Sequence, residues 1–564
     1  MRTLLITLSI CLCIFGFQFS EPQPFISPTG QDLRLSGTFG ELRNNHFHTG
    51  IDIKSRYGQP GDPILAVADG FISRIRISAV GYGQSIYIDH PNGYTSVYAH
   101  LHKFHPKWHK WLRELQVKHH ASLLDVRPYP DSLFVQQGDT IGFMGNSGSS
   151  LGVHLHFEIR HTKSESPVNP LRWSFPYHQQ HAPRAEWLKI YRLDEQLSII
   201  DESTFRLRGP NHHRHPSPKI IHRPAGRYAW SISAFDPFNQ WRNKNGLYAL
   251  ESFIDSQPAY SICMDSLPFH LNRYINAHID FPEYCQTRRH FHSLFKRPGN
   301  NSTAIADHQQ KGTSLLTDSC QKNIEIELRD IEGRTTSVQF ELRGMSKTTE
   351  TEKPTPSQMM THPNRKFFFE DENVRFTASQ GTFYSQHSID ISSQCVFEEG
   401  FFHPRLSINT ACHPFHGSAE LRFKNLYITD STSKEHICLG RIERGEWIDA
   451  GGQWEGNDFV AKVSEEGEYG LFVHIDKPQL RLTRGRLQAG QVMRFTVVQN
   501  RKSRFRYRDL HIEAYRGDQY LPFSFDKKYS LLKVPLPEDW TDDDQLTLRV
   551  ADRFGRYSTY KFPS

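Results

Sequence analysis

Apolar and polar residues alternate in short runs over the first 180 residues, and glycine-containing turns separate the runs. Residues 64–75 read as a strand, an Asp-Gly turn and a second strand, and residues 85–88 and 95–100 form another pair around an Asn-Gly turn. A period of two is typical of strands that bury one face, and Asp-Gly is typical of hairpin turns. The pattern predicts a β domain of short strands joined by turns over residues 25–180.

One segment of this domain follows the period of a helix. Tryptophan and leucine recur there at positions Trp108, Trp111, Leu112 and Leu115. This spacing places them on one face and predicts a helix over residues 108–117. The helix lies in residues 103–131, which we interpret as a packed insertion between two groups of strands, and which could form the wall of a groove.

Longer alternating runs begin at about residue 186. The hairpins predicted at residues 325–342 and 546–562 share the motif Asp-x-x-Gly-Arg, at Asp330 and at Asp552. The shared motif predicts two related β-sandwich (Ig-like) domains. We place them at residues 186–345 and 477–564, with a linker at 346–364 and a third β-domain at 365–476. The expected fold class is therefore mostly β.

The N-terminus has the character of an export signal. Arg2 precedes an apolar run over residues 4–17, and a polar, proline-containing stretch follows Ser20. The run is too short for a comfortable membrane span, so residues 1–20 are interpreted as a signal peptide. We expect the chain in the periplasm or cell envelope, or released from the cell. Lipid attachment at Cys11 is not favoured, because Ile10 stands where a small residue is needed, and no later segment is long and apolar enough to span a bilayer.

Composition and charge narrow the classes of partner. The 564 residues are 37% hydrophobic and 23% charged, which is typical of folded domains. The net charge of +6 fits an anionic polymer such as a cell wall, and equally an ordinary solvated surface. The chain has no dense basic block, so no nucleic-acid partner is expected.

Six cysteines lie beyond the predicted signal peptide, and the first of them is Cys263. An even number in an exported protein predicts disulfides, whose pairing the sequence does not define. Because no cysteine lies between residues 14 and 262, a metal site in the N-terminal domain must use histidine and carboxylate ligands.

Three strands of the N-terminal domain present polar groups on one face. In His48-Thr-Gly-Ile-Asp52 and in His154-Leu-His156-Phe-Glu158, the named residues alternate with residues that suit a core, and Tyr98-Ala-His100 repeats the pattern. Gly50 leaves room for a metal beside His48 and Asp52. A hydrolytic zinc site takes three histidine or carboxylate ligands and keeps one position for water, and it needs a proton acceptor nearby.

Other histidines are weaker candidates. His290-Phe-His292 has the same spacing without a partner motif, and the histidines of residues 211–215 are interpreted as a polar loop. His46 could serve as an alternative ligand or support one. The histidines at 119 and 120 lie in the insertion and are expected to be solvated.

Residues 31–173 resemble the lysostaphin/LytM-type zinc metalloendopeptidases. The matching segments are FHTGIDI, ILAVADGFI, GYTSVYAHL and QQGDTIGFMGNSGSSLGVHLHFEIR. The resemblance implies that His48, Asp52 and His156 bind one Zn²⁺. It further implies that His154 helps to activate water and that His100 assists proton transfer or stabilises the transition state.

The resemblance also implies a substrate, namely the cross-linking or bridging peptides of peptidoglycan. The leading hypothesis is an exported zinc metalloendopeptidase that cuts them. The alternative is a cell-wall-binding or hydrolase-activating protein with an idle zinc site, although such relatives typically lack some of the five site residues that are all present here. A third reading is a peptidase that acts on proteins, with the C-terminal β domains recruiting a protein partner. The insertion leaves open whether the scissile bond lies in a glycine bridge or a direct cross-link.

Overall fold

A computed structural model describes most of the chain. The described residues are 25–129, 132–179, 181–207, 219–238, 243–306, 308–345, 359–398, 401–426, 434–443, 445–473, 477–498, 505–506 and 510–563. The predicted signal peptide, most of the predicted linker and the histidines of residues 211–215 lie outside them. The structure is mostly β, which confirms the predicted fold class. No helix in the described part of the chain has both the length and the apolar character needed to cross a bilayer.

The N-terminal region, up to residue 179, is built on one large antiparallel sheet. The strands of that sheet, in spatial order, are β1 (Leu35–Gly37), β4 (Ile51–Lys54), β13 (His154–His161), β8 (Tyr94–Ala99), β7 (Gln84–Asp89), β6 (Gly70–Ile77) and β10 (Leu124–Val126), with β11 (Phe134–Val135) beside β6 and β14 (Pro167–Val168) beside β13. A small sheet and a hairpin complete the region, with the strands β5 (Pro63–Leu65), β12 (Thr140–Phe143), β9 (Lys103–Phe104), β2 (Leu42–Arg43) and β3 (His46–Phe47), and the 3-10 helix η1 (Pro170–Arg172) follows.

The pairing of β4 with β13 places the conspicuous polar residues opposite each other. Asp52 pairs with His156 and Ile53 with Leu155 in this antiparallel register. Ile51, Ile53, Leu155 and Phe157 are at most 1% exposed, so the apolar faces of both strands lie in the core. Burial of these four side chains fixes the register, because a slip of one residue would turn the polar residues into the core.

The predicted helix is present as α1 (Pro106–Lys118), with Trp108 and Leu112 buried. Proline in the first turn suits a helix start, where its missing N–H is not needed. The predicted insertion, however, is not wholly separate from the sheets. Its first residues form β9, which pairs with β12, and residues 124–126 form β10, which pairs with β6. Their backbone groups are hydrogen-bonded there, which explains why the insertion packs tightly.

The second region contains two sheets around one apolar core that includes Trp230, Leu250, Ile326 and Phe340. One sheet comprises β16 (Ile199–Arg206), β15 (Arg184–Leu193), β18 (Gly226–Phe238), β19 (Asn243–Asn245), β22 (His292–Ser293) and β23 (Ser314–Leu316). The other comprises β17 (Lys219–Pro224), β25 (Thr335–Met345), β24 (Gln321–Arg329), β20 (Ala249–Ile254) and β21 (Gln257–Cys263). Short helices follow β21, namely η2 (Phe269–Tyr274), α2 (Ile275–His278) and α3 (Phe281–Thr287).

The third region also packs two sheets on one core. The larger sheet comprises β26 (Met359–Met360), β29 (Ser388–Glu398), β30 (Phe401–Asn409), β36 (Gly467–Val473), β32 (Ile437–Glu443), β33 (Glu446–Gly451) and β39 (Phe505–Arg506). The smaller comprises β27 (Phe367–Glu370), β28 (Val374–Ala378), β31 (Ala419–Phe423), β35 (Asp458–Val463) and β34 (Gln453–Glu455), and η3 spans Lys434–His436.

The fourth region has a smaller core between two sheets. The first sheet comprises β37 (Gln479–Arg484), β38 (Val492–Val498), β43 (Leu531–Pro535) and β42 (Ser524–Asp526). The second comprises β41 (Gln519–Tyr520), β40 (Leu510–Arg516), β44 (Gln545–Asp552) and β45 (Tyr557–Pro563). The domain bounds and Ig-like topology given above remain predictions.

The two Asp-x-x-Gly-Arg motifs form the same turn. In the first, the Asp330 carboxylate accepts hydrogen bonds from the Arg334 backbone N–H at 2.8 Å and from its Nε at 2.9 Å. In the second, Asp552 accepts the equivalent bonds from Arg556 at 3.1 and 2.8 Å. The glycine between them has positive φ in both turns, 84° and 78°. Both predicted hairpins are therefore present and close in the same way.

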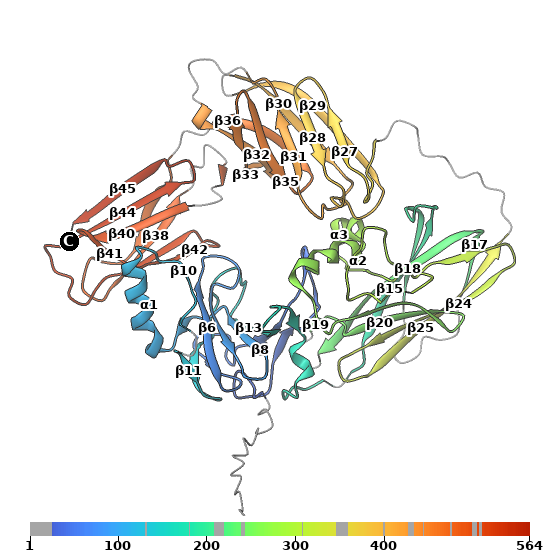
Figure 1. Ribbon diagram of the computed structural model, residues 1–564, viewed down its shortest axis with the longest axis horizontal. Coiled ribbons are helices and arrows are strands. Elements are labelled where there is room, and N and C mark those ends of the chain that lie inside the picture. Colours follow the sequence, from blue (N-terminus) through green and yellow to red (C-terminus); the bar gives the residue numbers. More distant parts are fainter. Residues whose placement is uncertain are drawn as a thin grey trace, which may run out of the picture.

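The four regions are arranged around a ring, in which the fourth returns to α1 and β10 of the first (Figure 1). Each neighbouring pair is in contact. The first and second regions share a core, because Phe39, Leu42 and Phe47 of the first pack in the cluster of the second. Tyr384 donates to the Arg273 carbonyl between the second and third regions at 2.8 Å. Arg553 pairs with Asp449 between the fourth and third, and Tyr520 bonds Ser122 between the fourth and first at 2.8 Å.

Candidate metal centre

Three side chains converge on one point at the centre of the large sheet. His48 Nε2 lies 3.0 Å from His156 Nδ1, and each of these atoms lies 3.1 Å from Asp52 Oδ1. Tetrahedral ligands about 2.0–2.1 Å from a zinc ion lie about 3.3 Å apart, so the triangle has the size that a metal requires. All three residues are buried, and they form the only group of this kind in the described part of the chain.

Gly50 gives the triangle its space. A Cβ atom at this position would lie 2.5 Å from the Phe157 carbonyl oxygen and 2.8 Å from Glu158 Cγ. No side chain fits at that distance. The glycine therefore allows β4 and β13 to approach closely enough for His48, Asp52 and His156 to meet.

Hydrogen bonds select the nitrogen that each histidine presents. Nδ1 of His48 lies 2.8 Å from the Thr38 carbonyl oxygen and donates to it, which leaves the Nε2 lone pair directed at the triangle. Nε2 of His156 lies 2.8 Å from Glu158 Oε1 and donates to it, which leaves Nδ1 directed at the triangle. A carboxylate behind a ligating histidine fixes its orientation and raises its basicity.

Glu158 is a functional residue that the sequence interpretation placed on the correct face but gave no role. It is fully buried and accepts hydrogen bonds from Arg160, Tyr82 and Thr49 at 2.7, 2.5 and 2.7 Å. Burial raises the pKa of Glu158, but Arg160 and His156 outweigh burial and hold the pKa well below its usual range. Glu158 is therefore an anion at neutral pH. Its position two residues after His156, on the same face of the strand, is the sequence signal that could have identified it.

Asp52 is held by a second residue that the sequence interpretation missed. Arg43 Nη2, on β2, donates to Asp52 Oδ2 at 2.9 Å. The other oxygen, Oδ1, is the one that faces the histidines. Burial raises the pKa of Asp52, but His48, His154 and His156 together lower it well below the usual value. No sequence signal links Arg43 to Asp52, because their contact depends on how the hairpin β2–β3 folds back.

The remaining two predicted site residues flank the triangle. Nδ1 of His100 bonds the Ser147 carbonyl at 2.9 Å, and Nδ1 of His154 bonds the Gly152 carbonyl at 2.9 Å. His154 Nε2 lies 3.4 Å from Asp52 Oδ1, and the His100 and His154 rings are 4.9 Å apart. Burial, followed by His156 and His154, lowers the pKa of His100 to about 3, so this imidazole is neutral at neutral pH.

One loop orients both of these imidazoles. Residues 146–152 supply the carbonyl groups that bond His100 and His154, and Ser150 Oγ lies 3.2 Å from His154 Nδ1. The loop is held from outside by Lys528 of the fourth region, whose Nζ donates to the Asn146 and Ser150 carbonyls at 2.8 and 2.7 Å. The C-terminal region thus contacts the segment that orients the flanking histidines.

The weaker candidates do not join the triangle. His46 is exposed and bonds the Asn44 carbonyl at 2.8 Å. His292 pairs with His278 at 2.9 Å in the second region, and His290 stacks on Tyr284. His120 is exposed, but it also stacks on Tyr520 of the fourth region at 5.4 Å, so it contributes to the contact between the two regions.

A buried His-Asp-His triangle is a ligand set that zinc accepts, and here two further imidazoles lie beside it. Residues 46–117 and 115–170 match the model of Peptidase family M23. The N-terminal region is therefore similar to the M23 peptidases, which confirms the resemblance to the lysostaphin/LytM-type enzymes.

Individual relatives match about a quarter of this chain. The DD-carboxypeptidase/endopeptidase Mpg of Neisseria meningitidis is 34% identical over 149 residues, which are 25% of this chain and 27% of the relative. The murein hydrolase activator NlpD of Escherichia coli is 35% identical over 24% of this chain and 28% of its own length. The catalytic domain of lysostaphin from Staphylococcus simulans is 22% identical over 25% of this chain and 90% of its own, with a TM-score of 0.19. The chain spans about a quarter of the length of the curated relatives it matches.

We expect Glu158→Gln to weaken metal binding about 10- to 100-fold, because the neutral amide no longer supports the basicity of His156. Competition with a chromophoric chelator, with Zn²⁺ as the probe, measures the affinity. Glu165→Gln is the matched control, since Glu165 lies just beyond β13 and is exposed. Unchanged affinity in Glu158→Gln would show that Glu158 does not support the ligand.

Metal affinity should also depend on pH. Burial lowers the pKa of His156, but Asp52 and Glu158 outweigh burial and raise it to about 9. The proton stabilises the metal-free fold below the ordinary histidine pKa of about 6.5, and this contribution is lost as the pH rises through about 9. Because metal must displace this proton, its apparent affinity should rise about tenfold per pH unit up to about pH 9 and then level. Chelator competition across that range checks the slope, and a flat profile would contradict it.

Proposed function

We propose that the chain is an exported zinc metalloendopeptidase that hydrolyses peptide bonds in peptidoglycan cross-links. The observation that carries the proposal is the presence of two oriented imidazoles, His100 and His154, beside the His48–Asp52–His156 triangle. A structural metal site needs no such groups, whereas hydrolysis needs a proton acceptor next to the ligands. A bound Zn²⁺ supplies Lewis acidity that lowers the pKa of water and polarises a peptide carbonyl.

The roles of the flanking histidines follow from their hydrogen bonds. Because Nδ1 of His154 is committed to the Gly152 carbonyl, the free acceptor is Nε2, which faces the triangle. His154 accepts the proton of the attacking water there. Asp52 Oδ1, 3.4 Å away, stabilises the imidazolium that forms, and the imidazolium then protonates the leaving amine.

His100 assists in a different way. Its Nδ1 donates to the Ser147 carbonyl, and its low pKa keeps Nε2 unprotonated. Nε2 of His100 therefore offers a second acceptor beside His154. Two acceptors at fixed positions orient both hydrogens of one water, so that its lone pair is available to attack the carbonyl.

The peptidoglycan substrate is supported by the relatives. Mpg is named for carboxypeptidase and endopeptidase activity, and NlpD for activating murein hydrolases. The mild positive charge of +6 also suits an anionic wall polymer. Export is supported by the polar N-terminus and apolar run of residues 1–20.

The second candidate function is that of a hydrolase activator with an idle site. The similarity to NlpD, 35% over 136 residues, favours it. The two candidates differ in one measurable respect, which is release of peptides from the wall by the purified protein alone.

Purified protein loaded with zinc should release peptide fragments from peptidoglycan sacculi. We expect His154→Ala to lower this rate by at least about 100-fold while metal content stays at the wild-type level, because a general base contributes about 10²–10⁴. Fragment release is followed by mass spectrometry and bound metal by elemental analysis. His161→Ala, on the exposed end of the same strand, serves as control. Peptide release by His154→Ala at the wild-type rate would remove His154 from the mechanism.

Lys528→Met tests whether the fourth region supports the site. Loss of the ammonium group frees the Asn146 and Ser150 carbonyls, so the loop that orients His100 and His154 is held less firmly. We expect kcat to fall about 10- to 100-fold, as for small misplacements of reacting groups, with metal affinity unchanged. The exposed neighbour Lys527→Met should retain wild-type kcat. If both variants turn over alike, the Lys528 contacts do not reach the chemistry.

A further inference from the structure

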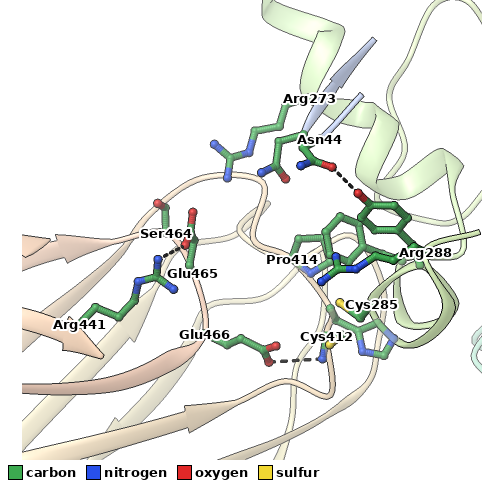
Figure 2. Close-up of a pocket in the computed structure, with 14 residues that line it drawn as sticks. Asn44, Arg273, Cys285, Arg288, Cys412, Pro414, Arg441, Ser464, Glu465 and Glu466 are labelled. Carbon is green, nitrogen blue, oxygen red and sulfur yellow. Dashed lines mark hydrogen bonds and ion pairs between the residues drawn. The ribbon is translucent and has the colours of Figure 1, made fainter. Parts of the chain in front are cut away.

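A pocket between the second and third regions brings two cysteines together. Cys285 lies on α3, and Cys412 lies in the turn that follows β30 (Figure 2). Their thiols interact directly. Both side chains are partly exposed, so a reagent can reach the pair from the pocket.

The interface around the pocket holds the two cysteines in place independently of any bond between them. Tyr274 of the second region stacks on His416 of the third at 4.5 Å. The Gly299 N–H donates to the Tyr384 carbonyl at 3.0 Å, and Tyr384 donates from its hydroxyl to the Arg273 carbonyl. A ring stack and two hydrogen bonds thus hold the second region against the third beside the two cysteines.

The turn itself is also constrained. Glu466 Oε2 accepts hydrogen bonds from the Thr410 backbone N–H at 2.8 Å and from the Thr410 hydroxyl at 2.7 Å. It also accepts one from the Cys412 N–H at 3.3 Å (Figure 2). Cys412 has a φ of +64°, an uncommon conformation for a residue with a side chain. The backbone is therefore held in a shape that directs the Cys412 thiol towards α3.

The other four cysteines in the described part of the chain have different surroundings. Cys263 donates to Asp265 at 3.4 Å, and Cys320 donates to the Gln321 carbonyl at 3.8 Å. Cys395 is exposed on β29, and Cys438 is buried against Phe472. No thiol neighbour accompanies any of these contacts.

A metal ion is the other ligand that two thiols can share. Among the described residues, however, the only cluster of three potential ligands is the His48 triangle. The nearby His413 is turned away from such a role, because its Nδ1 bonds the Thr410 carbonyl at 2.8 Å and its ring stacks on His387 at 4.2 Å.

We propose that Cys285 and Cys412 form a disulfide that joins α3 to the turn after β30, and so links the second region covalently to the third. The oxidant is a disulfide-bearing thiol oxidant of the export compartment. The Cys285 sulfur, as thiolate, attacks one sulfur of that disulfide and releases a thiol. This step leaves Cys285 in a mixed disulfide with the oxidant. The Cys412 sulfur then gives up its proton, attacks the Cys285 sulfur of the mixed disulfide and displaces the oxidant's second thiolate. The cysteine pair loses two electrons and two protons, and the oxidant is reduced to two thiols.

The surroundings favour a structural rather than an exchanging disulfide. Burial, Cys285 and Glu466 raise the pKa of the Cys412 thiol to about 12. A disulfide is readily reduced when one of the released thiols is stabilised as a thiolate. The raised pKa of Cys412 disfavours its thiolate, so this disulfide lacks that stabilisation. The bond also closes a long loop, which restricts the unfolded chain.

Peptide mapping tests the bond directly. Full-length protein produced by export, kept free of reductant and alkylated in denaturant, should yield one cross-linked peptide pair that contains Cys285 and Cys412. Its mass should be about 2 Da below the sum of the two reduced peptides, since two hydrogens are lost. After reduction, both cysteines should be alkylated. Alkylation of both without reduction, or a bond of either one to another cysteine, would overturn the proposal.

Thermal unfolding gives a second, independent measurement. Cys285→Ser, Cys412→Ser and the double variant should each lower Tm by the same several degrees, because each removes the same cross-link. Reductant should lower the wild-type Tm to the same value and leave the variants unchanged. Cys320→Ser and Cys395→Ser are the matched controls and should keep the wild-type Tm. The disulfide would be rejected if reductant left the wild-type Tm unchanged and the Tm decreases of the two single variants added up in the double variant. The Tm decreases would then come from lost packing.

Discussion

The site depends on the pairing of β4 with β13. This register sets Asp52 opposite His156. It also buries the alternate residues of both strands, which are at most 1% exposed. The geometry of the three ligand atoms is therefore a consequence of core packing. Gly50 is the one local requirement, because a side chain there would separate the strands.

Charge balance explains how so many polar groups remain buried together. Two carboxylates, Asp52 and Glu158, lie on either side of His156, and each has an arginine partner, Arg43 and Arg160 respectively. Buried carboxylates are costly unless paired and hydrogen-bonded, and here both conditions are met. With neutral imidazoles the formal charges of these four groups cancel. A dication added to this set leaves the centre positive, which favours electron-rich groups such as a carbonyl oxygen.

Much of the architecture and the central residues could be predicted from the sequence. Period-two alternation and Asp-Gly turns predict many of the strands, and alternation along β13 explains why His154 and His156 share a face. His48 and His100 follow the ends of β3 and β8, and His100 has a φ of +61°, so alternation alone does not place them. Glu158 obeys the alternation along β13 but was given no role, because its effect depends on the tautomer of His156. Arg43 and Lys528 could not be predicted. Arg43 meets Asp52 through the fold of a hairpin, and Lys528 meets the 146–152 loop across hundreds of residues of intervening chain. Strands β9 and β10 lie within residues 103–131, and their pairing with β12 and β6 could not be predicted either, because strand pairing is a non-local property.

Residues 39–47, which contain the hairpin β2–β3, tie the N-terminal region to the second region. The apolar residues Phe39, Leu42 and Phe47 of this segment are buried in the core of the second region, and Asn272 bonds both backbone groups of Phe47, one residue before the ligand His48. A gene segment that encoded residues 25–179 alone would leave these side chains facing water. The N-terminal region therefore depends on its neighbour for part of its apolar burial, and the backbone next to His48 is positioned by a residue of the second region.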